Sequence, residues 1–225
     1  EYVEYIDLSF EKMNFFRNKT IIVTGHTGFK GSWLTLWLTL LGAKVVGISR
    51  DIPSYPSLYK ILELEKKIID IRQDIRNLDK LVLIFKKYQP NIVFHLAAQA
   101  LVKKSYQDPR ETFTTNAIGT LNIMESIRSI KKKCYSVIIT SDKSYKNLEI
   151  KRGYHENDIL GGKDPYSASK ASAELIIQSY IHSFYIKKNN NKFFAIARAG
   201  NVIGGGDWSE DRLVPDCVKA CSKRK

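Results

Sequence analysis

The feature that most constrains the fold is a set of three evenly spaced glycines between a β-branched segment and an apolar one. Residues 21–23 are IIV, and residues 24–31 read TGHTGFKG before the apolar run 33–41. A GxxGxxG turn between a strand and a helix lets a diphosphate approach the backbone, while the helix N-terminus adds N–H groups and a positive dipole. The pattern alone also fits a turn used only for close packing, but the order strand, turn, helix favours a dinucleotide site.

Strand-like and helix-like segments alternate along most of the chain. Hydrophobic pattern and turn residues predict strands at 21–23, 44–48, 68–71, 92–96, 136–140 and 193–198. Helices are predicted at 31–41, 78–88, 111–129 and 166–186, with another from about residue 213. This alternation favours an α/β chain with a Rossmann-type, doubly wound parallel sheet covered on both faces. We expect an N-terminal extension (1–14), a dinucleotide-binding domain (15–199) and the start of a smaller, truncated substrate domain (200–225).

Composition narrows the choice of partners. The chain has 225 residues and a net charge of +13, so nucleotides or nucleic acid are candidate ligands. The basic residues form short scattered groups, and no basic arm is interleaved with aromatic residues, so no nucleic acid partner is predicted. The cysteines form no CxxC pair and no His cluster accompanies them, which predicts a reduced cytoplasmic protein without a metal site.

The apolar run and the two ends of the chain carry further expectations. The run 33–41 is too short to span a membrane and is predicted to be a buried helix, so no membrane partner is expected. The chain begins with Glu rather than Met and stops within a predicted helix, so we expect a fragment. Such a fragment is expected to bind a dinucleotide but to have little catalytic activity, because the cofactor motif is complete and the substrate domain is not.

The end of the second predicted strand bears on the choice of dinucleotide. Asp51 is placed to accept both ribose hydroxyls of NAD, whereas Arg50 is placed to hold the 2′-phosphate of NADP. NAD is favoured of the two. Asp51 also fits a plain turn or helix cap.

The ends of the third and fourth predicted strands supply the rest of a dinucleotide site. Asp74 and Ile75 would flank the adenine, although Asp74 also fits a surface carboxylate. Leu96, Ala97 and Ala98 would let the backbone pass close to the cofactor ribose, although small residues also serve packing between strand and helix.

A serine, a tyrosine and a lysine form the candidate catalytic set. Ser141 ends the fifth predicted strand, and Tyr166 and Lys170 lie four residues apart at the start of the next helix. Positions i and i+4 share a helix face, so the Lys170 ammonium should stabilise a Tyr166 phenolate and lower its pKa. His95, in contrast, is predicted to be a hydrogen-bonded core histidine.

These motifs together resemble the extended short-chain dehydrogenase/reductase superfamily and its NAD-dependent epimerase/dehydratase family. The segments GHTGFKGSWLTLWL, HLAAQ, TSDKSY, DPYSASKASAE and RAGNVIGGGDW are similar to those of the CDP-glucose 4,6-dehydratases, and the similarity runs over about residues 15–218. Asp142 and Lys143 are the most diagnostic pair, because dTDP-glucose dehydratases have Asp-Glu there. Arg50 is not the residue expected from this family, and the chain ends where roughly the last third of the family's length should begin.

The resemblance implies a role for each matching residue. The implied catalytic residues are Ser141, Asp142, Lys143, Tyr166 and Lys170, with Tyr166 as base and Asp142 as the acid that protonates the departing 6-hydroxyl. The implied cofactor-binding residues are Gly25, Thr27, Gly28, Phe29, Lys30, Gly31, Arg50, Asp51, Asp74, Ile75, Leu96, Ala97, Ala98 and Asn116. The implied substrate-binding residues are Gln99, Asn201, Arg212, Leu213 and Val214.

The implied activity is conversion of CDP-glucose to CDP-4-keto-6-deoxyglucose, a precursor of deoxysugars in bacterial surface polysaccharides. C4 is oxidised by bound NAD, water is lost across C5 and C6, and the hydride returns to C6, so the enzyme is an NAD-dependent lyase. The alternatives are another nucleotide-sugar epimerase, dehydratase or reductase of the superfamily, a noncatalytic NAD-binding sensor, or an RNA-binding protein. Resembling enzymes also form homodimers or higher oligomers through helices equivalent to 111–129 and 166–186.

Lys143 has two interpretations. An ordinary ammonium cannot accept the C5 proton at neutral pH, but burial beside Lys170 and the nicotinamide would lower its pKa, while Asp142 would raise it. We expect neutral Lys143 to be the C5 base in the closed complex. The alternative is a counter-ion that only positions Asp142.

Overall fold

The computed structural model describes residues 14–186 and 190–223, so the extension predicted for residues 1–14 lies almost wholly outside the described residues. The strands in this part of the chain are β1 (Thr20–Thr24), β2 (Lys44–Ser49), β3 (Ile69–Arg72), β4 (Ile92–His95), β5 (Cys134–Ser141) and β6 (Lys192–Ala199). Its α-helices are α2 (Phe29–Leu40), α3 (Leu58–Ile61), α4 (Leu78–Tyr88), α5 (Val102–Gln107), α6 (Pro109–Phe113), α7 (Gly119–Ser129), α8 (Pro165–Tyr180) and α9 (Leu213–Ser222). Shorter turns are the 3₁₀ helices η1 (Asn14–Phe16), η2 (Leu64–Lys66) and η4 (Asp142–Ser144), and the π-helical η3 (Thr114–Ile118) and η5 (Ile181–Tyr185).

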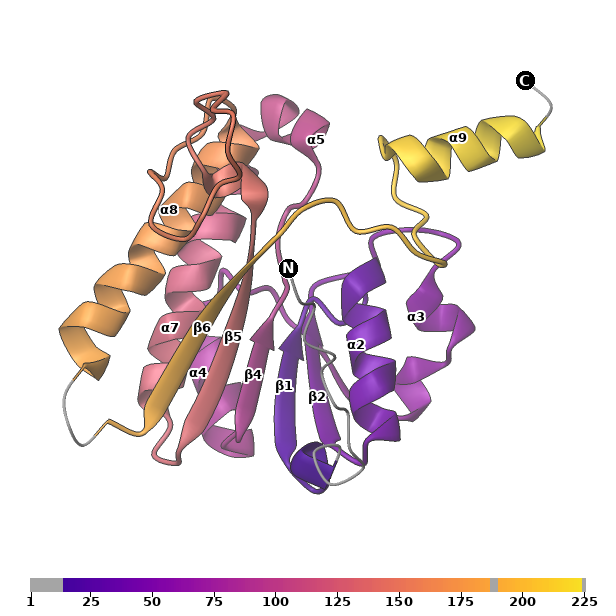
Figure 1. The fold of residues 1–225 in the computed structure, drawn as a ribbon. Helices are drawn as coiled ribbons and strands as arrows, with labels where there is room; N and C mark the ends of the chain where they lie inside the picture. The colour runs from indigo at the N-terminus through magenta and orange to yellow at the C-terminus, as the bar shows by residue number, and fades with distance from the viewer. Residues whose placement is uncertain (1–13, 187–189, 224–225) are drawn as a thin grey trace.

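The strands form one sheet in the order β3-β2-β1-β4-β5-β6, with every neighbouring pair parallel. The order reverses between β1 and β4, which pair with each other at the centre of the sheet. Val23 of β1 lies opposite Gly47 of β2 on one side and Phe94 of β4 on the other. In a doubly wound sheet this reversal opens a crevice at the carboxyl ends of the strands. The predicted fold class is therefore confirmed (Figure 1).

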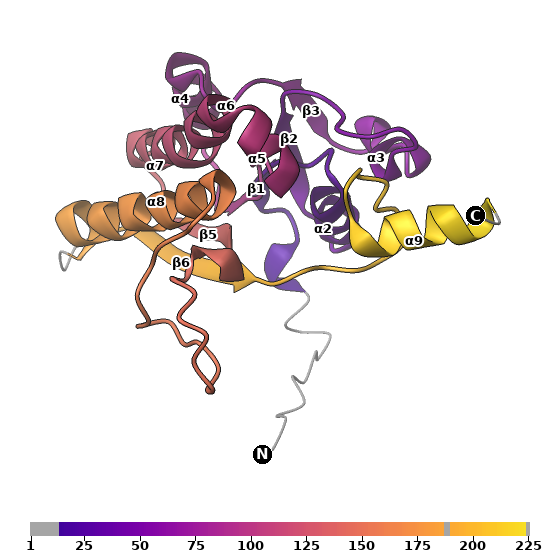
Figure 2. The same ribbon diagram turned by 90° about the horizontal axis from the view of Figure 1, so that it is seen from above.

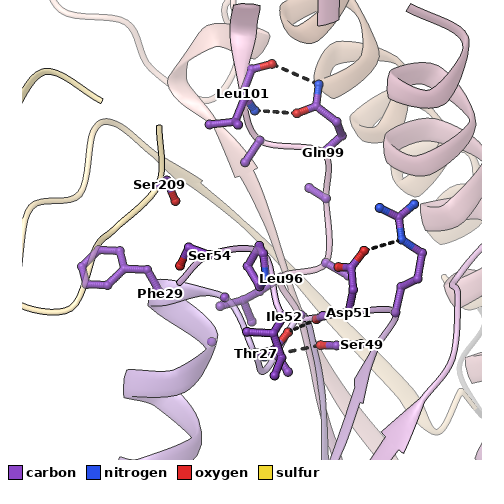
Figure 3. A pocket seen from close by; sticks show the side chains of 18 of the residues that line it. Thr27, Phe29, Ser49, Asp51, Ile52, Ser54, Leu96, Gln99, Leu101 and Ser209 are labelled. Atoms are coloured by element: carbon purple, nitrogen blue, oxygen red, sulfur yellow. Dashed lines mark hydrogen bonds and ion pairs between the residues drawn. The ribbon is translucent and has the colours of Figure 1, made fainter. Parts of the chain in front are cut away.

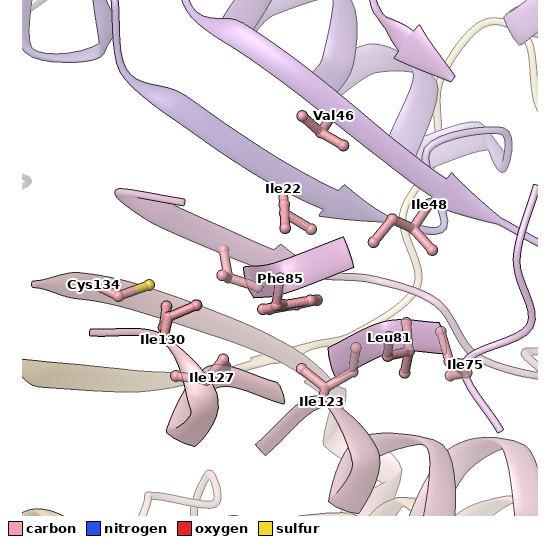
Figure 4. Close-up of a cluster of buried hydrophobic side chains, with 11 residues drawn as sticks. Ile22, Val46, Ile48, Ile75, Leu81, Phe85, Ile123, Ile127, Ile130 and Cys134 are labelled. Atoms are coloured by element: carbon pink, nitrogen blue, oxygen red, sulfur yellow. The ribbon is translucent and has the colours of Figure 1, made fainter. Parts of the chain in front are cut away.

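Alternate residues of the central strands face two separate cores. On one face Ile22 packs with Phe85 of α4 and Ile127 of α7 (Figure 4). On the other face Ile21 packs with Leu38 of α2. Figure 2 shows the corresponding layers, with α4, α7 and α8 on one side of the sheet and α2 on the other.

Two expectations about coverage were too strong. The second face of β5 and β6 is only partly covered, since Tyr135 and Phe193 stack at 5.1 Å and stay about two-fifths exposed. The helix at 33–41 is not buried throughout, because Trp33 and Trp37 on its outer face are 46% and 53% exposed. The apolar composition of a helix does not show which of its faces packs against the sheet and which stays exposed.

Helix boundaries also differ from those predicted. The helix expected at 111–129 starts at Pro109, where the Asp108 side chain accepts the Glu111 N–H, and it contains the π turn η3 before α7. The short helices α3 and α5 lie in segments where no element was predicted. Each makes few turns, so hydrophobic periodicity has little length in which to show itself.

The segment after β6 leaves the sheet. Residues 200–212 contain no helix or strand and lead to α9, which lies apart from the sheet in Figure 1. Two contacts tie this segment back: the Trp33 indole donates to the Gly205 carbonyl at 2.9 Å, and Lys103 pairs with Asp211 at 3.1 Å. The predicted domain boundary near residue 200 stays a prediction.

Neither membrane-spanning helices nor metal-binding clusters occur in the described ranges. No helix there is both long and apolar enough to cross a bilayer. No group of three or more His, Cys, Asp or Glu side chains there is arranged to hold a metal ion.

Candidate active site

A cavity of about 660 Å³ opens at the carboxyl ends of β1, β2 and β4, where the strand order reverses (Figure 3). Most of the predicted cofactor residues line it: Gly25, Thr27, Gly28, Phe29, Lys30, Gly31, Arg50, Asp51, Asp74, Ile75, Leu96, Ala97 and Ala98. Two predicted substrate residues, Gln99 and Arg212, also line it. Asn116, Asn201, Leu213, Val214 and the predicted catalytic residues are not part of its wall.

The glycine turn is fixed by lack of space. Gly25 has φ +76°, and a Cβ there would lie 2.7 Å from the Ala97 nitrogen. A Cβ on Gly31 would lie 2.0 Å from the Gly25 carbonyl oxygen. Side chains at these positions would push the turn away from α2 and β4, so both glycines are required by packing. At Gly28 the nearest atom to a Cβ is 3.4 Å away, so packing leaves room for one.

A buried polar network that the sequence did not reveal supports this turn from below. The His26 ring is fully buried, with Nδ1 3.0 Å from Ser49 Oγ and Nε2 2.9 Å from Asp70 Oδ1. Tyr59 donates its hydroxyl to the other oxygen of Asp70 at 2.5 Å. Burial, opposed in part by Asp70, lowers the pKa of His26. A neutral ring can donate to Asp70 and accept from Ser49, which satisfies both ring nitrogens.

Ion pairs occupy the end of the cavity after β2. Arg50 donates to Asp51 and to Glu111, each at 2.8 Å, and Lys104 pairs with Glu111 at 3.0 Å. Asp74 is bound by the neighbouring Arg76 rather than left free. Asp51 remains 58% exposed at the cavity, so it is accessible to a ligand hydroxyl.

The segment after β4 is held by amide side chains. The Gln99 amide is fully engaged, donating to Leu101 and Thr112 and accepting from the Leu101 N–H. Asn116 is buried behind the cavity wall, where its amide bonds the Gln99 backbone and Ser169 of α8. Asn116 and the Gln99 side chain therefore shape the wall instead of presenting free polar atoms to a ligand.

His95 occupies the core position that was predicted. It is 3% exposed, with Nδ1 2.6 Å from Thr24 Oγ1 and Nε2 3.1 Å from Thr120 Oγ1. Burial, reinforced by the charge of Lys170, lowers its pKa to about 3, so the ring is neutral.

Ser141 is a hydrogen-bond partner of Tyr166, and Lys170 lies one turn further along the same helix; each of the three is less than a tenth exposed. Ser141 ends β5, whereas Tyr166 and Lys170 lie on the first turns of α8, whose N-terminus is capped by Asp164. Burial raises the pKa of Tyr166, although Ser141 and the Arg212 charge act against it. The expected lowering of this pKa by Lys170 is therefore wrong for the chain alone, because the loss of solvation outweighs the Ser141 hydrogen bond and the Arg212 charge.

Lys170 shows the opposite shift. Burial and the charge of Lys30 lower its pKa to about 8, with Glu174 acting in the other direction. Lys30 and Arg212 line the cavity and also act on Lys170 and Tyr166, so these two cations link the cavity electrostatically to the catalytic set. The Arg212 Nε is buried with no hydrogen-bond partner among the described residues.

Asp142 and Lys143 are exposed on η4, immediately after β5. Ser141 donates its hydroxyl to Asp142 at 3.0 Å and accepts the Lys143 N–H at 3.2 Å. Of the remaining substrate candidates, Asn201 is exposed on the segment after β6, and Leu213 and Val214 are exposed on α9. That segment instead lines the cavity with Trp208, which sequence analysis missed although it ends the motif GGGDW.

The strand order, the cavity at its reversal point and the adjacent Ser-Tyr-Lys set define a Rossmann-type chain of the epimerase and dehydratase class. The family model of GDP-mannose 4,6-dehydratase matches residues 22–200. The chain therefore belongs to that family.

Individual relatives agree with this assignment. The chain is 47% identical over 210 residues to the CDP-glucose 4,6-dehydratase of Salmonella typhimurium, covering 92% of this chain and 58% of that protein. Among solved structures, an epimerase from Methanothermobacter thermautotrophicus matches with a TM-score of 0.81 at 26% identity, over 96% of this chain and 62% of the other. MoeE5 in complex with UDP-glucose and NAD matches with a TM-score of 0.73 at 25% identity, over 89% of this chain and 60% of the other. The chain thus spans about three-fifths of the length of these relatives.

Proposed function

We propose that the protein to which this chain belongs is a CDP-glucose 4,6-dehydratase that uses bound NAD. The observation that carries the proposal is a complete glycine cradle beside buried Ser141, Tyr166 and Lys170, followed along the chain by Asp142 and Lys143. The similarity to the Salmonella enzyme over 92% of this chain supports the same substrate. We also propose that residues 15–199 form the cofactor domain and that the substrate domain begins near residue 200.

The residues of the cavity fit a dinucleotide. Gly25 and Gly31 permit the tight turn, Gly28 leaves the backbone at the α2 N-terminus open to a diphosphate, and Asp51 is exposed where a ribose would lie. Arg50 already has two carboxylate partners, so a 2′-phosphate would have to displace one; this favours NAD over NADP. When bound there, NAD would supply a hydride acceptor that also returns the hydride.

Side chains of this chain would accept and donate the protons of the reaction. Tyr166, with Ser141 beside it, would take the proton from the C4 hydroxyl. The Arg212 charge already favours its phenolate, and Lys170, four residues further along α8, would do the same. Asp142 in its protonated form would give its proton to the departing C6 oxygen, since η4 holds its carboxyl group exposed at the same sheet edge. The Arg212 Nε, which has no hydrogen-bond partner in residues 14–186 and 190–223, would bind the diphosphate of the nucleotide sugar, because a buried guanidinium nitrogen favours an anion.

Partner and location follow from the same proposal. The expected ligand is a nucleotide sugar, and self-association would use α7 and α8, where Leu175 and the nearby Phe184 are half exposed. A cytoplasmic location fits the three cysteines, which are all free.

The test is product formation by a full-length form given CDP-, dTDP-, UDP- and GDP-hexoses in turn. We expect a 4-keto-6-deoxy product from CDP-glucose in preference to the others. Tyr166→Phe, which keeps the ring, should lower turnover by about two to four orders of magnitude with little change in NAD affinity. An epimerised hexose without loss of water would instead identify an epimerase, and NAD binding without conversion of any sugar would identify a sensor.

A further inference from the structure

A fully buried carboxylate lies directly behind the catalytic residues. Glu174 is on α8, one turn beyond Lys170 and two turns beyond Tyr166, and its side chain is 0% exposed. Positions i, i+4 and i+8 follow one face of a helix, so these three groups form a single buried stripe. The proposed reaction uses the first two members of the stripe and gives no role to the third.

Glu174 receives hydrogen bonds from three other elements. Thr140 of β5 donates to Oε1 at 2.6 Å, and Ser144 of η4 lies 2.8 Å from the same oxygen. Arg198 of β6 donates Nε to both oxygens at 2.9 Å and its terminal nitrogen to Oε2 at 2.5 Å. Charge-assisted bonds of this bidentate kind fix orientation as well as distance.

The two hydroxyl donors flank the turn that carries the reactive side chains. Thr140 precedes Ser141, and Ser144 follows Lys143, so both ends of the turn are bonded to the same carboxylate. The single Ser144 hydroxyl hydrogen is shared between Glu174 and the Ser141 carbonyl oxygen, which lies 2.6 Å from Oγ and closes the turn on itself. Glu174 therefore connects the backbone of Ser141, Asp142 and Lys143 to the helix that carries Tyr166 and Lys170.

Arg198 extends the connection to the loop between η4 and α8. Its guanidinium lies 4.5 Å from the centre of the Tyr145 ring, and it donates to the Glu156 carbonyl at 3.2 Å. A buried ion pair is often no more stabilising than well-packed apolar residues of similar volume, because both charges lose their solvation. Geometry is therefore the property that this pair supplies and an apolar pair would not.

We propose that Glu174, held by Arg198, is a positioning residue that sets the distance between the Ser141–Lys143 turn and the Tyr166–Lys170 pair. The inference rests on the proposed dehydratase function. Tyr166 and Lys170 are on α8 itself, whereas exposed Asp142 and Lys143 depend on the turn for their position. Loss of the connection should thus slow the elimination of water more than the oxidation at C4.

The experiment compares variants of a full-length form on CDP-glucose. Glu174→Gln keeps the shape but removes the charge, and we expect kcat to fall at least ten-fold while KM and NAD affinity change less than about three-fold. In a single turnover, oxidation at C4 should produce NADH at a rate near that of the wild type. The NADH absorbance should then persist, because the elimination of water that precedes hydride return is slower. Glu125→Gln is the matched control, since Glu125 also bonds a tyrosine of α8, Tyr180, and an arginine, but lies outside the site. It should retain the wild-type kcat.

A second variant separates position from folding. Glu174→Met with Arg198→Met removes both charges at similar volume, so it should fold with a melting temperature near that of the wild type. It should still show the ten-fold lower kcat and the persistent absorbance. Wild-type kcat in this folded double variant overturns the inference while leaving the proposed function intact. Absence of a 4-keto-6-deoxy product with wild-type protein overturns the proposed function and this inference with it.

Discussion

The turn after β1 and the turn after β5 lie at the same edge of the sheet, but they are held by different forces. The first is held by contact: a single added carbon on Gly31 would lie 2.0 Å from the Gly25 oxygen. The second is held by charge, through a buried carboxylate that receives bonds from Thr140, Ser144 and Arg198. A turn that binds a diphosphate needs backbone N–H groups that the ligand can approach closely. A turn that carries a catalytic acid needs its side chains held in fixed positions. The cradle should therefore respond to added volume and the catalytic turn to changed charge.

The largest expected effect comes from adding volume to the cradle. Gly31→Ala should lower the free energy of unfolding by about 3 kcal/mol or more and abolish NAD binding, because its Cβ meets backbone that cannot rotate away. Gly28→Ala is the control: its Cβ has room, and φ −74° suits alanine. It should unfold within about 1 kcal/mol of the wild type but bind NAD more weakly, since the methyl group blocks the diphosphate. Urea unfolding and calorimetry measure both. Equal stability of the two variants would contradict steric control of this turn.

The same difference explains what could be predicted from the sequence. Steric demands at the cradle leave only glycine acceptable at Gly25 and Gly31, so they are visible as a local motif, and the alternating segments predicted every strand to within two residues. Charge demands at β5 are met by residues far apart in the chain. Thr140, Glu174 and Arg198 look individually like ordinary strand and helix positions, and their contact follows only from the pairing of β5 with β6 and the packing of α8.

Burial at the site was also hidden from the sequence. The spacing of Tyr166 and Lys170 predicts a shared helix face, and both residues are buried on α8, but how far each side chain loses solvent depends on the whole surrounding structure. That loss reversed the expected direction of the Tyr166 pKa shift. His26 was overlooked because it occupies a variable position of the glycine motif, and Asp70, its partner, lies on a strand two places away in the sheet.

The next largest effect tests whether the β5 turn acts through charge. We expect Lys143→Met in a full-length form to lower turnover about a hundred-fold and to abolish exchange of the C5 hydrogen with solvent deuterium, while C4 oxidation continues. The physical reason is that Lys143, if it is the C5 base, accepts a proton that methionine cannot accept. Mass spectrometry of the recovered sugar measures the exchange. Deuterium entering C5 at the wild-type rate would assign Lys143 the counter-ion role instead.

The smallest effect concerns the cost of keeping Lys170 charged inside the protein. Its pKa is lowered to about 8 by burial and by Lys30, whereas the pKa of a lysine in the unfolded chain is about 10.4. Between these two values the unfolded chain binds more protons than the folded one, so the free energy of unfolding rises with pH in this window. Below pH 8 both states are protonated, and the folded state bears the full penalty of the buried ammonium.

Lys170→Met removes that penalty at similar length and flexibility. Without NAD, the variant should therefore be more stable than the wild type at pH 7, by about 1 to 3 kcal/mol, although it should be catalytically inactive. The difference should shrink by about 1 kcal/mol between pH 7 and pH 9, because the wild-type lysine begins to lose its proton when folded. Urea unfolding of both proteins at the two pH values gives the difference directly, and titrations common to both cancel. Gly28→Ala, measured alongside, should show no such pH-dependent difference, since a contact between neutral atoms does not titrate. A Lys170→Met protein less stable than the wild type at pH 7 would mean that the ammonium stabilises the folded chain. The catalytic residues would then resemble the glycine turn after β1, in that holding them in place has no electrostatic cost.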